Sequence, residues 1–214
     1  MSTVDCLFIS WGAEHVNLLL FSGFLGSGKT TAIIGLAKTA AASGRKVAFV
    51  VNEIGEIGID NQLMRQLGLN VWELVAGCIC CTISGDLIET LEKLDADYGP
   101  DLVIVEASGA ADPERVLAML PHYHGRSLSS VRTATLVDPL RLPMLMEVLT
   151  PLITSQIEHA DVVIVSKADM ATADEIEFAR KTVGTINPQA SIVVAGAQGA
   201  AHDDVAPRLL PWPI

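Results

Sequence analysis

A glycine-rich segment between an apolar run and a helical pattern constrains the fold of this chain more than any other feature. Residues 23–30 (GFLGSGKT) match the pattern G-x-x-x-x-G-K-[ST], with an apolar run at residues 16–21 before them and a helical pattern at 30–43 after them. Glycines let such a loop wrap tightly, so that backbone N–H groups can point inward at phosphate oxygens. The segment therefore predicts a strand, a phosphate-binding loop (P-loop) and a helix, in that order.

The P-loop also predicts which side chains hold a nucleotide and its Mg²⁺. Lys29 is expected to reach the β- and γ-phosphates, and Thr30 is expected to ligate Mg²⁺. The full set of nucleotide contacts expected from this segment is Gly23, Gly26, Ser27, Gly28, Lys29, Thr30 and Thr31.

Further apolar runs indicate the sheet that surrounds this unit. They lie at residues 46–51, 71–75, 102–106, 133–137, 162–166 and 192–195. Most are continuously hydrophobic, which is typical of strands buried on both faces. Because helical stretches lie between many of them, we predict an α/β fold with a doubly wound, mostly parallel sheet of the P-loop NTPase class. We expect a single domain over 1–214, with an N-terminal extension at 1–15 and an irregular tail at 202–214.

Local signals predict where several helices begin. Asp112 and Asp138 each precede a proline, which is the pattern of an N-cap followed by the first helical residue. Residues 172–175 (TADE) form a capping box, and a helix with Ser84 as its cap is expected over 84–94.

Composition limits the class of partner and the compartment. The chain has 14 basic and 25 acidic residues, a net charge of −11, which argues against general binding to nucleic acid or anionic membranes. A nucleotide is still allowed, because backbone amides and one lysine make a phosphate site locally. No apolar run reaches the roughly 18 residues that span a bilayer, and the start lacks the basic segment of a signal peptide. We therefore expect a cytoplasmic protein without membrane contact.

Two later strand ends carry residues suited to the same nucleotide. Glu106 ends the run 102–106 and is placed to organise Mg²⁺ or its water, while Gly109 is expected to offer its amide to the γ-phosphate. Residues 166–169 (SKAD) end the run 162–166 and resemble the N/T/S-K-x-D guanine motif. A carboxylate at Asp169 can accept from guanine N1–H and the exocyclic amine, whereas adenine offers neither there. Lys167 would lay its alkyl stem over the base, so we predict GTP rather than ATP.

Three of the four cysteines are crowded at Cys78, Cys80 and Cys81, too close together for a disulfide framework. Because they precede a helical stretch, their thiolates are expected to have depressed pKa values that favour metal binding. Soft sulfur ligands suit Zn²⁺, Cu⁺ or a thiophilic late transition metal. Three sulfurs need not meet one ion, so two cysteines with Glu53 or a histidine are an equal alternative. Buried structural thiols and a redox thiol are the other interpretations.

The segments GFLGSGKTT, NEIGEIGID, GCICC, EASGAADP and SKAD occur in this order. Together they resemble the CobW/HypB/UreG family of metal-handling GTPases over residues 17–196, nearest the CobW-like branch. The resemblance implies roles in phosphate, Mg²⁺ and guanine binding for Lys29, Thr30, Glu106, Lys167 and Asp169. It implies metal ligands at Cys80 and Cys81, with Cys78 and Glu53 as further candidates and Asp60 as a residue that positions Mg²⁺ or water. CobW-like proteins usually carry a second domain, so we expect a short form.

These expectations combine into one leading function and one alternative. The leading prediction is a slow GTPase that couples GTP and Mg²⁺ to the handling of Zn²⁺, or of Co, Ni or Fe, for a client metalloprotein, working through that partner or as a GTP-dependent homodimer. No arginine is obviously placed to stabilise the transition state, so low intrinsic turnover is expected. The alternative is a GTP-dependent activator of a metalloenzyme in which the cysteines hold only structural zinc. A small-molecule kinase fits less well, because no lid with paired arginines is evident.

Overall fold

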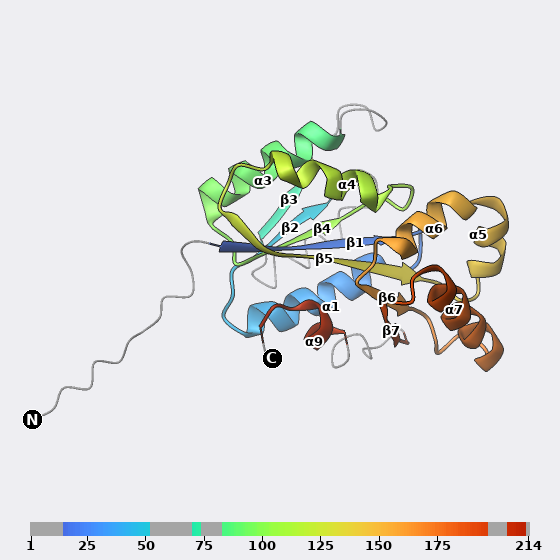
Figure 1. Ribbon diagram of the computed structural model, residues 1–214. Helices are drawn as coiled ribbons and strands as arrows, with labels where there is room; N and C mark the ends of the chain where they lie inside the picture. The colour runs from blue at the N-terminus through green and yellow to red at the C-terminus, as the bar shows by residue number, and fades with distance from the viewer. Residues whose placement is uncertain (1–14, 52–69, 74–82, 197–204, 213–214) are drawn as a thin grey trace, which may run out of the picture.

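The fold is a seven-stranded sheet between layers of helices, seen in a computed structural model that describes residues 15–51, 70–73, 83–196 and 205–212. Every strand pair among the described residues is parallel, and the strand order is β3-β2-β4-β1-β5-β6-β7 (Figure 1). The strands are β1 (His15–Gly23), β2 (Val47–Val51), β3 (Asn70–Glu73), β4 (Leu102–Glu106), β5 (Ser127–Val137), β6 (Val162–Val165) and β7 (Ser191–Val194). The predicted α/β class with a mostly parallel sheet is confirmed.

The central strands are hydrophobic throughout because both faces of the sheet are buried. In β1, Leu18 and Leu20 join one apolar cluster, while Leu19 and Phe21 join the cluster on the other face. All four side chains are at most 2% exposed. Successive side chains of a strand point to opposite faces, so two covered faces require an unbroken apolar run.

Helices follow most strands and cover both faces. They are α1 (Lys29–Ala42), α3 (Ile83–Tyr98), α4 (Pro113–Met119), the short 3₁₀ helix η1 (Leu120–His122), α5 (Leu142–Val148), α6 (Thr150–Glu158), α7 (Ala173–Ile186) and α9 (Ala206–Leu209). Helices α1 and α9 pack on the face that includes Phe21, while α3 and α4 pack on the face that includes Leu20 (Figure 1). Among the described helices, none is both long and apolar enough to cross a membrane.

Side-chain caps confirm two predicted helix starts. The Asp112 carboxylate accepts a hydrogen bond from the Glu114 amide at 3.1 Å, which caps α4 behind Pro113. Thr172 and Glu175 make the reciprocal capping box of α7, because each side chain accepts the other residue's amide. These hydrogen bonds hold the pKa of Glu175 below its ordinary value.

The predicted start at Asp138 is wrong. Helix α5 begins at Leu142, with Arg141 at the N-cap position and no side-chain cap. Asp138 instead forms a turn, in which its carboxylate accepts from the Leu140 amide at 3.1 Å and its carbonyl accepts from the Leu142 amide at 2.9 Å. Asp-Pro begins turns as readily as helices. In this turn, the second carboxylate oxygen of Asp138 remains available to accept from Lys167.

The predicted irregular tail also needs correction. Residues 206–209 form the short helix α9, and the buried side chains Val205, Leu209 and Leu210 join the same apolar cluster as Phe21. Arg45 places its guanidinium 5.1 Å from the ring centre of Trp212. The tail therefore packs against the core, although its prolines had favoured irregular structure.

At the amino ends of the strands, a polar network fixes the loop between η1 and β5. Asp95 accepts from the side chain of Arg126 at 2.5 Å and from its amide at 2.7 Å, and Arg126 donates in turn to the Pro100 carbonyl at 2.7 Å. Burial alone would raise the pKa of Asp95, but these bonds outweigh it and hold the pKa below its ordinary value. Burial beside Asp95 raises the pKa of Tyr123. These polar groups at the amino ends of the strands are thus engaged in hydrogen bonds that stabilise the fold.

At the carboxyl ends of the strands, the sheet has a topological switch point, where the connections from two neighbouring strands go to opposite faces. Strand β1 leads to α1 on one face, whereas its neighbour β4 leads to α4 on the opposite face. In open α/β sheets, ligands bind outside the carboxyl ends of the strands at such a point. The fold therefore directs attention to the loops after β1 and β4.

Two glycine substitutions test this account of the fold. Gly23 has φ of 130°, and an added Cβ would lie 2.5 Å from the Leu136 carbonyl oxygen, so Gly23→Ala should lower the free energy of unfolding by more than about 2 kcal/mol. Gly184 lies in α7 with nothing within 4 Å of an added Cβ, so Gly184→Ala should raise it by about 0.5–1 kcal/mol. Urea denaturation followed by circular dichroism checks both. Equal effects of the two substitutions would contradict the packing described for Gly23.

Candidate functional site

The P-loop joins β1 to α1 and takes its shape from three glycines. Gly23, Gly26 and Gly28 have φ of 130°, 73° and 94°, which are values that other residues rarely adopt. Gly28 occupies the N-cap position of α1 without a side-chain cap. A helix start of this kind presents backbone amides and the positive end of the helix dipole to an anion.

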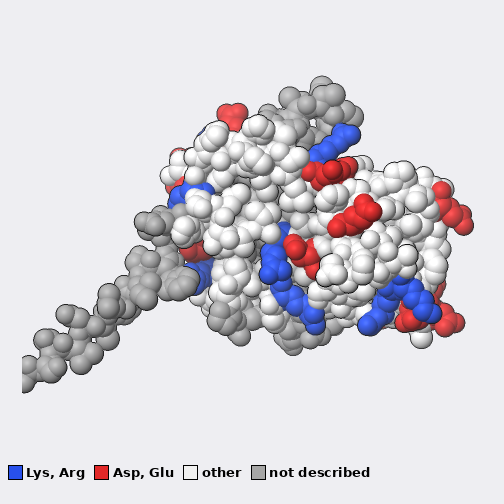
Figure 2. Space-filling model, in the orientation of Figure 1, with Lys and Arg blue, Asp and Glu red and all other residues white. Residues whose placement is uncertain are grey.

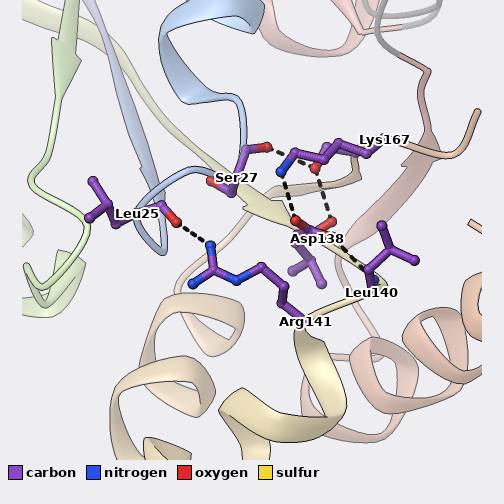
Figure 3. A network of polar contacts seen from close by, with 8 residues as sticks. Leu25, Ser27, Asp138, Leu140, Arg141 and Lys167 are labelled. Carbon is purple, nitrogen blue, oxygen red and sulfur yellow. Dashed lines mark hydrogen bonds and ion pairs between the residues drawn. The ribbon is translucent and has the colours of Figure 1, made fainter. Parts of the chain in front are cut away.

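Three carbonyl groups of the P-loop are held by side-chain donors. Buried Lys29 donates to the Gly23 carbonyl at 3.0 Å. Arg141 donates to the Leu25 carbonyl at 2.7 Å, and Ser166 donates to the Ser27 carbonyl at 2.8 Å (Figure 3). Carbonyl oxygens repel phosphate, so these bonds favour a loop in which the amides are available to an anion.

The hydroxyl of Ser27 provides a test of whether a phosphate fits this loop. Ser27 is 2% exposed, and its Oγ has no hydrogen-bond partner among the described residues. A buried hydroxyl without a partner is unfavourable, and a phosphate oxygen is a partner that would satisfy it. The loop and its donors therefore fit a nucleotide.

The structure brings Thr30 and Glu106 together from different elements. The hydroxyl of Thr30, in the first turn of α1, donates to the Glu106 carboxylate at the end of β4 at 3.0 Å. Hydroxyl and carboxylate oxygens are hard ligands of the kind that Mg²⁺ prefers. The donor set therefore suits the predicted magnesium site, while Thr31 lies exposed one residue further along α1.

Gly109 lies against the P-loop, in the segment that follows β4. A Cβ at Gly109 would lie 2.5 Å from the Leu25 amide nitrogen and 2.9 Å from the Leu25 Cα. Only a residue without a side chain allows the two backbones to approach this closely. The predicted γ-phosphate segment and the P-loop are therefore direct neighbours.

The predicted guanine-binding segment follows β6 and reaches the same edge. The Ser166 hydroxyl donates to the Ser27 carbonyl, and this bond connects the end of β6 to the P-loop. Lys167 has φ of 53°, an uncommon value for a residue with a side chain. Asp169 is exposed beside Gly196, where an added Cβ would lie 3.2 Å from the Asp169 carboxylate. The Asp169 carboxylate therefore lies close to Gly196, where a larger residue would crowd it.

Sequence reasoning missed the turn after β5 as part of the site. The Lys167 ammonium donates to the Asp138 carboxylate at 2.8 Å, and the Asp138 side chain is only 4% exposed (Figure 3). Arg141, in the same turn, lies 5.3 Å from the ring centre of Phe24 as well as bonding to Leu25. The one signal available was position, because Asp138 ends a buried strand at the carboxyl edge.

Two adjacent residues of α6 were missed as well. Buried Gln156 and its neighbour Ser155 donate from their side chains to the segment that contains Gly109. No motif marks them, since a glutamine within a helix carries no local signal of its partner.

The remaining predicted site residues, Glu53, Asp60, Cys78, Cys80 and Cys81, lie outside the described residues. Within the described part of the chain, no group of three or more His, Cys, Asp or Glu residues is arranged to hold a metal ion. The cysteine site therefore stays a prediction.

A double-mutant cycle tests the pairing of Lys167 with Asp138. Lys167→Met leaves a buried carboxylate without its partner, so the free energy of unfolding should fall by about 1–2 kcal/mol, less than for a fully buried pair because Lys167 is partly exposed. Adding Asp138→Asn removes that charge, so the double variant should lose at least about 1 kcal/mol less than the sum of the single losses. Strictly additive losses in urea denaturation would show that the two groups do not interact.

Comparison with known proteins agrees with this geometry. A family model described as CobW/HypB/UreG, nucleotide-binding domain, matches residues 17–194. The zinc chaperone YeiR of Escherichia coli (strain K12) is 31% identical over 156 residues, which cover 72% of this chain and 47% of that protein. The zinc-regulated GTPase metalloprotein activator 1 of Schizosaccharomyces pombe is 29% identical over 190 residues, which cover 84% of this chain and 46% of that protein.

A solved structure shows the same fold. The hydrogenase maturation factor HypB of Archaeoglobus fulgidus has a TM-score of 0.64 at 16% identity, covering 90% of this chain and 87% of that one. The chain spans about half the length of the two curated relatives. A P-loop tied to the ends of β4, β5 and β6, and a family match over residues 17–194, together place this chain in the CobW/HypB/UreG family, of which it contains the nucleotide-binding domain.

Proposed function

We propose that this chain binds GTP with Mg²⁺, hydrolyses it slowly, and couples its nucleotide state to the handling of a transition metal, with zinc as the first choice. One observation carries the proposal: the P-loop, the Thr30–Glu106 pair and the SKAD segment meet at one edge of the sheet. The match to the CobW/HypB/UreG nucleotide-binding domain supports the same conclusion.

Guanine selectivity is assigned to residues 166–169. The Ser166–Ser27 bond fixes this segment relative to the P-loop, so the position of the base follows from the position of the phosphates. The Asp169 carboxylate accepts two hydrogen bonds from guanine, and an adenine base has no donors in that place. The bond to Asp138 fixes the rotamer of Lys167, so that the stem of Lys167 forms one side of the base site in a fixed position.

The reaction is assigned to charge neutralisation at the γ-phosphate. Lys29 and the loop amides hold the phosphates, Thr30 and Glu106 hold Mg²⁺ or its water, and Mg²⁺ when bound neutralises developing negative charge. Arg141 bonds to the Leu25 carbonyl and stacks near Phe24, which assigns it to supporting the loop. Low intrinsic turnover remains the proposal.

Metal handling is assigned to the cysteine segment. Cys78, Cys80 and Cys81, with Glu53 as a further ligand, offer soft thiolates suited to zinc, and Co, Ni and Fe are alternatives. The names of two relatives refer to zinc. Glu53, Asp60 and the cysteines lie between the P-loop and Glu106 in the sequence, where segments of P-loop GTPases respond to the γ-phosphate.

A second function is favoured by one of those relatives, which is named a zinc-regulated GTPase metalloprotein activator. In this alternative, the GTP state gates a metalloenzyme and the cysteines hold zinc that never leaves. Transfer distinguishes the two: zinc-65 loaded on the protein passes to an acceptor chelator on GTP hydrolysis in the first case and stays bound in the second.

A client protein or a second copy of this chain is also part of the proposal. Leu25 of the P-loop is 59% exposed, and Met144 and Val148 on one side of α5 are 48% and 63% exposed. Exposed apolar side chains such as these suit contact with another protein, and Leu25 lies in the P-loop itself. On the face shown in Figure 2, acidic and basic side chains are interspersed.

Replacing Asp169 tests the base assignment. Asp169→Asn converts one double acceptor into a group with one acceptor and one donor, so GTP affinity should fall roughly tenfold or more while ATP affinity stays low. Xanthosine triphosphate, whose base carries a carbonyl in place of the exocyclic amine, should bind the variant better than the parent. Asp174→Asn, a matched loss of charge in the first turn of α7, should leave all three affinities unchanged. Calorimetry showing ATP bound as tightly as GTP by the unmodified chain would contradict guanine selectivity.

A further inference from the structure

A buried glutamine connects α6 to the segment that follows β4. The Gln156 side-chain amide donates to the Gly109 carbonyl at 3.3 Å and to the Ala111 carbonyl at 3.2 Å. Gln156 is 1% exposed, so water has little access to these bonds. The neighbouring Ser155 donates to the Asp112 carboxylate at 2.7 Å. Two adjacent residues of α6 therefore hold residues 109–112 by three hydrogen bonds.

The backbone of Gln156 is itself connected to the base of the P-loop. Its carbonyl accepts from the Thr135 hydroxyl at 2.6 Å, and Thr135 is hydrogen bonded to the Ser22 hydroxyl at 2.6 Å. Ser22 directly precedes Gly23, the first glycine of the P-loop. Ser22 and Thr135 are both at most 1% exposed. A continuous buried chain of hydrogen bonds thus runs from the P-loop through β5 and α6 to Gly109.

We propose that Gln156 is a positioning residue that holds Gly109 beside the P-loop and so raises the affinity of the site for GTP relative to GDP. The inference rests on the proposed nucleotide function and assigns a role that no sequence motif suggested. Gly109 is already in close contact with Leu25, which places its segment where a γ-phosphate would follow the P-loop. Gln156 holds the same segment through its bonds to the Gly109 and Ala111 carbonyls.

The chemistry of the two nucleotides gives the expected effect. GDP lacks the γ-phosphate, so its affinity depends on the P-loop and the guanine-binding segment but not on Gly109. GTP gains full affinity from an additional contact with Gly109 only if the Gly109 segment is already ordered, because ordering it on binding would cost free energy. Removing the Gln156 donors leaves the Gly109 and Ala111 carbonyls buried without these hydrogen bonds, which makes the position of the Gly109 segment beside the P-loop less stable. The removal should therefore weaken the binding of GTP more than that of GDP.

The experiment measures affinities for GDP and for a non-hydrolysable GTP analogue, with Mg²⁺, by calorimetry on the full chain. Gln156→Met keeps the length of the side chain and removes both donors; it should reduce the ratio of GTP-analogue to GDP affinity by roughly tenfold. Gln156→Glu keeps the shape of the side chain, and at this buried position the carboxyl group takes up a proton, so its one O–H can donate to only one of the two carbonyls and the ratio should fall by less than in Gln156→Met. If Gln156→Met fails to fold, the second variant still decides.

Asn187→Ala is the matched structural control. Asn187 donates to the Ile157, Glu158 and Ala160 carbonyls at the carboxyl end of α6, directly after Gln156 in the sequence, and these three bonds involve none of residues 109–112. Its loss should lower the unfolding midpoint in urea and leave the nucleotide ratio unchanged. A Gln156→Met ratio equal to that of the parent, with lowered stability alone, would show a structural role only and overturn this inference.

The same measurements separate this inference from the proposed function. If the unmodified chain binds neither guanine nucleotide, both are wrong. If it binds both nucleotides and the ratio is the same in the parent and the Gln156 variants, the proposed function stands and the role of Gln156 is overturned.

Discussion

The carbonyl oxygens of the P-loop are the points on which the geometry of the site depends. A loop that binds phosphate must direct its amides inward, so its carbonyls need donors elsewhere. Here those donors come from three parts of the fold: Lys29 within the loop, Arg141 after β5 and Ser166 after β6. The same elements carry the residues that we propose to bind the phosphates and the guanine base. The loop is thus held by the segments to which the rest of the proposed nucleotide site is assigned.

Further bonds connect the proposed base site to the P-loop. Asp138 pairs with Lys167 of the proposed guanine-binding segment, and the turn that Asp138 forms places Arg141 on the P-loop. Gly109 packs against Leu25, and Gln156 donates to the Gly109 carbonyl. Leu25 therefore contacts both the segment after β4 and, through its carbonyl, the turn after β5. Gly109 is therefore in direct contact with both α6 and the P-loop.

Much of this could be read from the sequence, because the signals were local. The apolar runs of β1 and β6, the glycines of the P-loop, and the caps at Asp112 and Thr172 each act over a few residues. The contacts that were missed join distant residues: Arg141 to Leu25, Lys167 to Asp138, and Gln156 to Gly109. Strand β5 was predicted from residue 133 because its first half alternates, whereas it begins at Ser127. The tail at 202–214 was expected to be irregular because of its prolines, and nothing local showed that Leu209 packs on core partners far away in the sequence.

The central claim is that nucleotide state and metal affinity are coupled, and one measurement tests it most directly. The dissociation constant for Zn²⁺ is measured against a competing chelator on reduced protein saturated with Mg²⁺ and either a non-hydrolysable GTP analogue or GDP. The account predicts a difference of roughly 5- to 150-fold between the two states, together with the same factor in nucleotide affinity when zinc is added. Replacing Cys80 and Cys81 by serine should abolish the difference and spare nucleotide binding. Equal zinc affinity in both states would contradict the coupling and leave two independent sites.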